Sequence, residues 1–176
     1  MFRVPLRLLA AGALALLAAC ATPAEPGQMV VGRDAAAPAF PVAFNAAICV
    51  RSVGGGQETN PLMMSQVDDR AFRFALEASL RENGLLGAAC RYQADATLLS
   101  LVQPMFGLDL RVTALVNYAL ADNSGTLLLR ETIGSAFTAT FSDSPIAVMR
   151  LKLANEGAIR TSINDFLGRL RELKPK

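Results

Sequence analysis

A regular alternation of side chains between positions 108 and 120 constrains the fold of this chain more than any other feature. The segment reads LDLRVTALVNYAL, in which the even-numbered residues from Leu110 to Leu120 are apolar or aromatic. Alternate side chains of a strand point to opposite faces of a sheet, so the pattern predicts a β-strand with one buried face. The turn sequence that follows, residues 122–125, ends in glycine and favours a tight hairpin. An antiparallel sheet with a core on one side is therefore expected.

Other segments predict the remaining elements. Strands are expected at 44–50, 92–103 and 126–141, and helices at 66–83 and 145–173. Ser65 and Ser144 are the expected N-caps, and Gly157 is expected to allow close packing of the second helix on the sheet. The order β-α-β-β-β-α predicts an α+β fold. In this two-layer sandwich a mainly antiparallel four-stranded sheet carries both helices on one face.

The first 20 residues have the pattern of an export signal. Arg3 and Arg7 precede the uncharged run 8–17, which is too short to span a bilayer. The sequence then ends Leu-Ala-Ala-Cys at Cys20 and resembles the lipobox of bacterial lipoproteins. That resemblance implies cleavage before Cys20 and attachment of lipid to it, and Ala21 in the next position resembles the pattern of outer-membrane lipoproteins. The alternative is an ordinary signal peptide followed by a cysteine.

These signals divide the chain into three parts. Residues 1–19 are the expected signal peptide, 20–41 a lipidated N-terminus with a tether, and 42–176 a single domain. The tether is rich in alanine and holds four prolines, so we expect it to stay extended and to hold the domain tens of ångströms from the membrane. The predicted location is the periplasmic face of the outer membrane.

An exported chain places its cysteines in an oxidising compartment. With Cys20 acylated, Cys49 and Cys90 remain, and a disulfide between them is expected. Two buried free thiols are the alternative. The sequence contains no histidine and no paired-cysteine spacing, so no metal site is expected.

The charge balance gives no reason to expect nucleic-acid binding. The chain has 17 basic and 15 acidic residues, and the numbers become equal once Arg3 and Arg7 are cleaved off with the signal. Binding to phosphates requires clustered Lys and Arg, so no nucleic-acid partner is expected.

Catalytic chemistry also has little support in the sequence. Histidine, the commonest base for a serine or cysteine nucleophile, is absent. Asp95, Asp109 and Glu131 are candidates for the paired carboxylates of glycoside hydrolysis. Strand carboxylates near Arg111 and Arg130 more often form cross-strand ion pairs. We therefore expect no enzyme activity, no catalytic residues and no cofactor.

One face of the sheet is a candidate binding surface. With the even-numbered residues of the second and third strands facing inward, four leucines are expected to face outward: Leu99, Leu101, Leu115 and Leu128. A half-apolar, uncovered sheet face suggests a partner-binding surface. The alternatives are that scattered exposed leucines are ordinary, or that the tether covers them. The same register sends Glu131 inward, where it could meet Asn155, unless a bulge near Gly134 turns it outward.

The sequence as a whole resembles a class of bacterial envelope proteins. The lipobox, the tether and the segments ALEASLRENGLL (75–86), YQADATLLSL (92–101) and VNYALADNSGTLL (116–128) resemble small lipoproteins of Gram-negative bacteria. Three kinds are similar: YajG-like lipoproteins, the lipopolysaccharide-assembly lipoprotein, and the auxiliary lipoproteins of lipid-transport ABC systems. The resemblance implies a membrane-tethered, non-catalytic module that docks an envelope protein. The alternative is a carrier or sensor of a lipid or other apolar ligand held between helices and sheet.

Overall fold

The computed structural model describes residues 21–61 and 64–175, so Cys20 and the signal lie outside the described residues. Two short 3-10 turns, η1 (Pro26–Met29) and η2 (Val42–Phe44), precede the main elements. These are β1 (Ile48–Gly54), α2 (Asp69–Glu82), β2 (Tyr92–Val102), β3 (Leu110–Asp122), β4 (Leu127–Ala139) and α3 (Ala147–Glu172). The order β-α-β-β-β-α is the predicted one.

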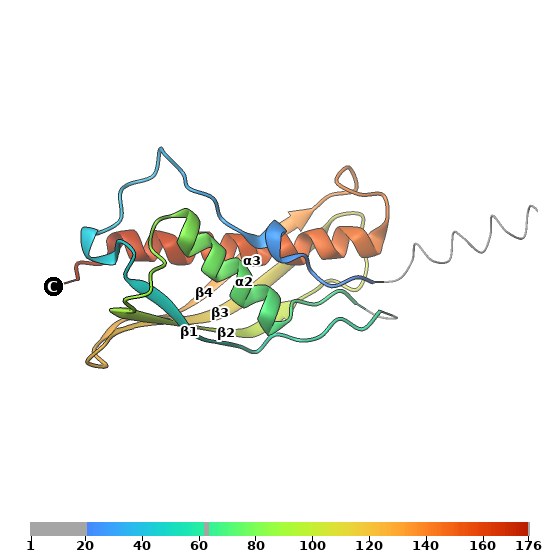
Figure 1. Cartoon of the computed structure of the whole chain (residues 1–176). Helices are drawn as coiled ribbons and strands as arrows, with labels where there is room; N and C mark the ends of the chain where they lie inside the picture. The colour runs from blue at the N-terminus through green and yellow to red at the C-terminus, as the bar shows by residue number, and fades with distance from the viewer. Residues whose placement is uncertain (1–20, 62–63, 176) are drawn as a thin grey trace, which may run out of the picture.

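The four strands form one sheet in the order β1-β2-β3-β4. β1 and β2 are parallel, whereas β2, β3 and β4 form an antiparallel meander. A parallel pair requires a crossover connection, and α2 supplies it. Both helices cover the same face of the sheet (Figure 1). The predicted α+β two-layer sandwich is confirmed.

The core lies between the helices and this inner face, and the alternation in β3 accounts for it. Every even-numbered residue from Leu110 to Leu120 is buried. Phe166 of α3 stacks on Tyr118 with ring centroids 4.4 Å apart. The Tyr118 hydroxyl lies 3.1 Å from the hydroxyl oxygen of Ser162. Burial raises the pKa of Tyr118 and the Ser162 hydrogen bond only partly offsets this, so the phenol stays neutral.

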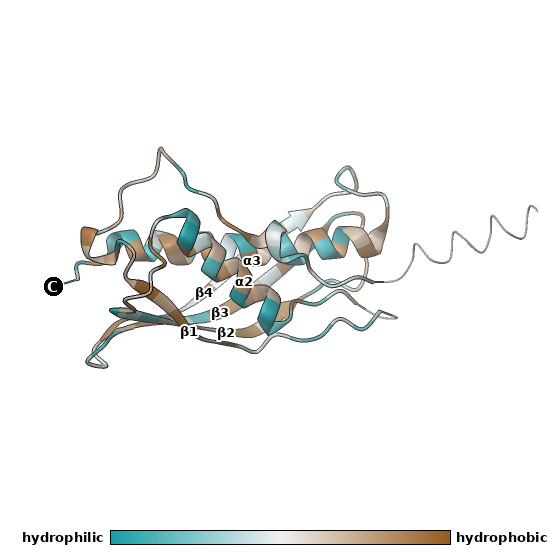
Figure 2. Ribbon diagram, in the orientation of Figure 1, coloured by the Kyte–Doolittle hydropathy of each residue, from teal (hydrophilic) through white to brown (hydrophobic). Residues whose placement is uncertain are grey.

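Both helices are amphipathic, and each turns its apolar side to the sheet (Figure 2). Asp68 caps α2 by accepting a hydrogen bond from the backbone N–H of Ala71 at 2.8 Å, so the expected cap at Ser65 was three residues too early. α3 begins at Ala147 with Ile146 as N-cap, two residues beyond the expected cap, Ser144.

Gly157 brings α3 close to β4, as its position in the sequence predicts. A Cβ atom at this position would lie 2.2 Å from Cδ1 of Phe137. No larger residue fits between the two elements without moving the Phe137 ring.

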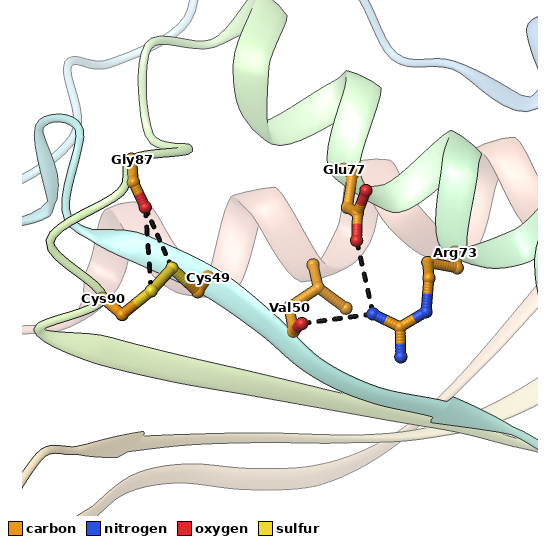
Figure 3. Close-up of a disulfide and its surroundings, with 6 residues drawn as sticks. All are labelled: Cys49, Val50, Arg73, Glu77, Gly87 and Cys90. Atoms are coloured by element: carbon orange, nitrogen blue, oxygen red, sulfur yellow. Dashed lines mark hydrogen bonds and ion pairs between the residues drawn. A yellow bond between two sulfur atoms is a disulfide. The ribbon is translucent and has the colours of Figure 1, made fainter.

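A disulfide joins Cys49 of β1 to Cys90, immediately before β2, with their Cα atoms 5.0 Å apart (Figure 3). The predicted pair is thus present. Gly87 lies against this bridge, with its carbonyl oxygen 2.9 Å from Sγ of Cys49. A disulfide sulfur has no proton to donate, so this is a close contact rather than a hydrogen bond. On the helix side, Arg73 of α2 donates to the carbonyl of Val50 at 3.2 Å, which holds α2 on β1.

The segment after Cys20 is packed against the domain, which corrects the expectation of an extended tether. Ala24 and Met29 belong to the core, and η1 lies against both α2 and α3. The backbone N–H of Val31 donates to the Ser79 hydroxyl at 2.9 Å. The composition predicted that this segment could not form a core of its own. It packs instead into the core that the two helices help to form.

A buried carboxylate on α3 holds this segment. Glu156 is 2% exposed, and its Oε1 accepts the backbone N–H of Glu25 at 2.7 Å. Lys152 lies 3.8 Å away, one helical turn earlier. Burial raises the pKa of Glu156; the hydrogen bond from Glu25 and the positive charges of Lys152 and Arg160 only partly offset it, and the Glu25 carboxylate adds to the rise.

Replacing Glu156 with glutamine is expected to flatten the pH dependence of stability. Since the folded-state pKa lies above the unfolded value, the folded protein holds the extra proton between the two pKa values. The free energy of unfolding therefore falls as pH rises through that window, and it stays lower above it. Glutamine keeps an acceptor for the Glu25 N–H and does not titrate. Urea unfolding from about pH 4 to about pH 7 should show the fall only with Glu156 present; equal slopes in both proteins would contradict this.

Candidate functional site

The face of the sheet opposite the helices is uncovered in the described part of the chain. We call it the open face. Its outward side chains from β2, β3 and β4 include Thr97, Leu99, Val102, Arg111, Thr113, Leu115, Asn117, Arg130 and Thr132. Leu99 is 53% exposed and Leu115 is 37% exposed. These two leucines are the apolar centre of the surface.

Two of the four predicted leucines are not on the open face, because each strand concerned contains a bulge. In β2 the register shifts between Leu98 and Ser100, so that Leu99 is the extra residue and Leu101 pairs with Ala114 on the inner face. Leu101 accordingly packs against the core. Since alternation has a period of two, one inserted residue reverses the face of everything after it.

The second bulge, in β4, falls on Leu128 itself. Leu129 pairs with Leu120, and Leu127 pairs with Ala121, which leaves Leu128 as the extra residue. It is half-buried and packs against the core. The expected pairing of Leu120 with Leu127 is therefore wrong by two residues, and Leu128 is removed from the candidate surface.

The apolar centre of the open face is bordered by polar groups. A Cβ atom at Gly134 would lie 3.6 Å from Cδ1 of Leu115, so this leucine covers the glycine of the neighbouring strand. Beside it, the Asn117 amide donates to the Thr132 hydroxyl at 3.0 Å. This arrangement of an apolar centre and a hydrogen-bonding border is typical of a protein-docking surface.

At the β1 side, the open face ends in an ion pair. Asp95 accepts hydrogen bonds from the Arg51 guanidinium and from the Ser52 hydroxyl. Burial alone would raise the pKa of Asp95, but these two partners outweigh it and hold the pKa below its ordinary value. The carboxylate is thus ionised and engaged at neutral pH.

The three candidate catalytic carboxylates are engaged at different places. Asp95 pairs with Arg51, Asp109 accepts the backbone N–H of Phe141 at 3.2 Å, and Glu131 forms an ion pair with Arg169 at 2.9 Å. These contacts are structural. Absence of enzyme activity stays a prediction.

The possible meeting of Glu131 with Asn155 is wrong, and so is the alternative of a bulge near Gly134, because the β3–β4 register is continuous there. Glu131 pairs with Tyr118 in the β3–β4 register, but β4 is an edge strand, so its side chain reaches Arg169 at the surface. Asn155 is fully buried and is bonded elsewhere. Its amide donates to the Ser65 carbonyl at 2.9 Å, and its oxygen accepts from Gln103 at 2.8 Å.

Sequence reasoning missed a second apolar surface, at the loop between β2 and β3. Met105, Phe106 and Leu108 are 84%, 89% and 74% exposed. With Phe141, Ile146 and Met149, which are also exposed, they form what we call the apolar tip. The signal was visible in the sequence, since loops are usually polar and this one reads QPMFGLD.

A metal site and a membrane span were both sought among the residues that the structure describes. Within residues 21–61 and 64–175, no three metal-ligating side chains gather. The helices of that same part of the chain lack the length and hydropathy needed to cross a bilayer. An open hollow of about 620 Å³ lies at the end of the molecule opposite the apolar tip. Its lining includes Arg91, Tyr92 and Leu173.

Comparison with known proteins supports the fold. No protein-family model matches the chain, and no curated protein matches it. A crystal structure from Xanthomonas campestris, described as a DUF330 protein, is similar with a TM-score of 0.58 and 12% identity, over 81% of this chain and 91% of that one.

Two further solved structures are similar. A hypothetical protein from Chlamydia trachomatis has a TM-score of 0.52 and 8% identity, over 72% of this chain and 96% of that one. A minor lipoprotein from Acinetobacter baumannii has a TM-score of 0.44 and 12% identity, over 74% and 98%. The first two show that the described domain has a fold found in other bacterial proteins.

Proposed function

We propose that this chain is a non-catalytic lipoprotein of a Gram-negative cell envelope that docks a partner protein through the open face. In this proposal Cys20 carries the lipid that holds the protein at the periplasmic face of the outer membrane. The lipobox and the disulfide support an exported, anchored protein. Several acyl chains on one residue make a durable anchor, since each buried methylene contributes about 0.8 kcal/mol.

The observation that carries the docking proposal is the exposure of Leu99 and Leu115 at the centre of an uncovered sheet face. The tether, which could have covered them, packs against α2 and α3 instead. The carrier alternative lacks such an observation. The layer between helices and sheet is filled by fully buried side chains, among them Phe72, Leu76, Ile159 and Ile163.

Replacing Leu115 with aspartate is expected to weaken the complex by about tenfold or more, because a charge would replace a leucine buried on binding. The full chain is expressed in its own organism with a photoreactive amino acid at Thr132, which pairs with Asn117 on the open face, two positions along β3 from Leu115. The cross-linked partner is then quantified.

The matched control is Leu127→Asp, since Leu127 is 47% exposed and lies at the turn end of β4, away from the centre of the open face. Both variants should retain the disulfide and the helical circular dichroism. Equal cross-linking in the two variants would overturn the docking proposal. Labelling with radioactive palmitate in the same cells reports separately on the lipid at Cys20.

A further inference from the structure

The described chain begins at a fixed point on the domain. Ala21 is 5% exposed, and its backbone N–H donates to the Pro61 carbonyl at 3.0 Å. Three residues later, the Ala24 N–H donates to the Gln66 carbonyl at 3.2 Å. Consecutive Cα atoms are about 3.8 Å apart, so Cys20 is attached to the domain without a free spacer. A lipid on Cys20 would hold this end of the molecule directly against a bilayer.

Side-chain contacts show that this is the end at which α3 begins. The Glu25 carboxylate forms an ion pair with Lys152, and the Glu25 backbone N–H donates to the Glu156 carboxylate. Both partners lie in the first half of α3. Gln103, immediately after β2, donates to the Ser65 carbonyl at 2.8 Å. The end of β2, the start of α3 and the start of the described chain thus lie together (Figure 1).

The apolar tip lies at this same end and is a single unit made of two loops. Arg150 of α3 is 3% exposed and donates to the carbonyls of Ser144 at 2.6 Å and Gly107 at 3.3 Å. The Asp109 carboxylate also accepts a hydrogen bond from the backbone N–H of Phe141. These contacts hold the β2–β3 loop against the β4–α3 loop, so the exposed apolar side chains of the two loops lie together at this end of the molecule.

We propose that the apolar tip inserts into the surface of the lipid bilayer that carries the Cys20 anchor. Large exposed apolar side chains mark a contact with a membrane or a protein, and here the chain start places the anchored lipid at the tip. Apolar side chains of a peripheral protein lie at the boundary between headgroups and acyl chains.

The charges around the tip fit this contact. The Arg150 guanidinium is turned into the protein, and it also lies over the Phe141 ring at 5.5 Å. The oxygens of Asp109 and Asp143 accept hydrogen bonds from loop groups, and Thr140 holds the pKa of Asp143 below its ordinary value. Insertion would therefore depend on the burial of the apolar side chains of the tip, while the exposed carboxylates of Asp109 and Asp143 lie beside them.

Insertion also fixes the direction of the open face. β2 ends at the tip and β3 begins there, so the axes of both strands point toward the bilayer and the open face lies roughly perpendicular to the bilayer plane. This inference rests on the proposed anchor but uses a different surface from the proposed docking site, and the two can fail separately.

The test uses the absence of tryptophan from the chain. Phe106→Trp places one fluorescent reporter at the most exposed tip residue, where an aromatic ring is retained and folding is not affected. The lipidated full chain is reconstituted into vesicles of phosphatidylethanolamine and phosphatidylglycerol, with or without bromine on the acyl chains. We expect at least about a twofold loss of emission with brominated lipid, since aromatic rings at the interface lie near the acyl chains.

The control is Leu127→Trp at the turn end of β4, which lies away from the tip on a strand of 13 residues that is about 43 Å long. Its emission should not change with bromine. Equal quenching at both positions, or none at position 106, would overturn the insertion while leaving the docking proposal intact. If the reporter at position 106 were shielded from solvent in native membranes but not in vesicles, the tip would contact a protein rather than lipid. This result would also overturn the insertion. A chain that does not float with the vesicles contradicts both the anchor and the insertion.

Discussion

Loss of the Cys49–Cys90 disulfide is expected to lower the free energy of unfolding by about 4 kcal/mol. The two cysteines are 41 residues apart. Closing a loop of that length lowers the conformational entropy of the unfolded chain, which contributes about 4 kcal/mol to the free energy of unfolding. The loop contains all of α2, and β1 is an edge strand of the sheet, next to β2. The bridge therefore holds together the one parallel pair of the sheet.

The measurement is urea unfolding with and without a thiol reductant. The Cys49→Ser, Cys90→Ser double variant should unfold at the same lower urea concentration as the reduced wild-type protein, and reductant should not affect it. An unchanged midpoint in wild-type protein whose thiols are shown by mass spectrometry to be reduced would contradict the expectation.

Replacing Phe166 with alanine is expected to cost about 4 kcal/mol of stability. Its side chain is fully buried and stacks on Tyr118, so truncation loses the transfer free energy and leaves a cavity at the centre of the α3–β3 contact. Tyr118 would also lose the ring that helps keep its hydroxyl beside Ser162.

Phe74→Ala is the matched control, because Phe74 of α2 is 54% exposed. Its removal should change the free energy of unfolding by less than about 0.5 kcal/mol. Urea unfolding of both variants at one pH compares them directly. A Phe166→Ala midpoint equal to that of Phe74→Ala would show that α3 is not docked through this ring.

The order and type of the elements could be predicted because local patterns carry them. The alternation in β3 has no interruption, and every residue that it assigns to the inner face is buried. The two bulges have no such signal, since an inserted residue is an ordinary leucine in a leucine-rich strand. This is why Leu99 and Leu115 were placed correctly, whereas Leu101 and Leu128 were not.

The packing of residues 21–31 depended on partners that the local sequence does not show. Proline and alanine dominate the composition, yet Met29, Val30 and Val31 form a short apolar run within it. Whether such a run is buried depends on the free surfaces of α2 and α3, which are far away in the sequence. The burial of Glu156 could not be predicted from the sequence either, because a carboxylate on a helix is usually solvated.

The length of α3 has a consequence for reach. A helix of 26 residues is about 39 Å long, and this one extends from the apolar tip to the hollow beside Leu173. If the tip end rests on the bilayer, the helix spaces the far hollow, together with Pro175 near the C-terminus, nearly 40 Å from the headgroups. A fluorescent protein fused at the C-terminus would therefore report on that more distant layer and leave the lipid-facing end undisturbed.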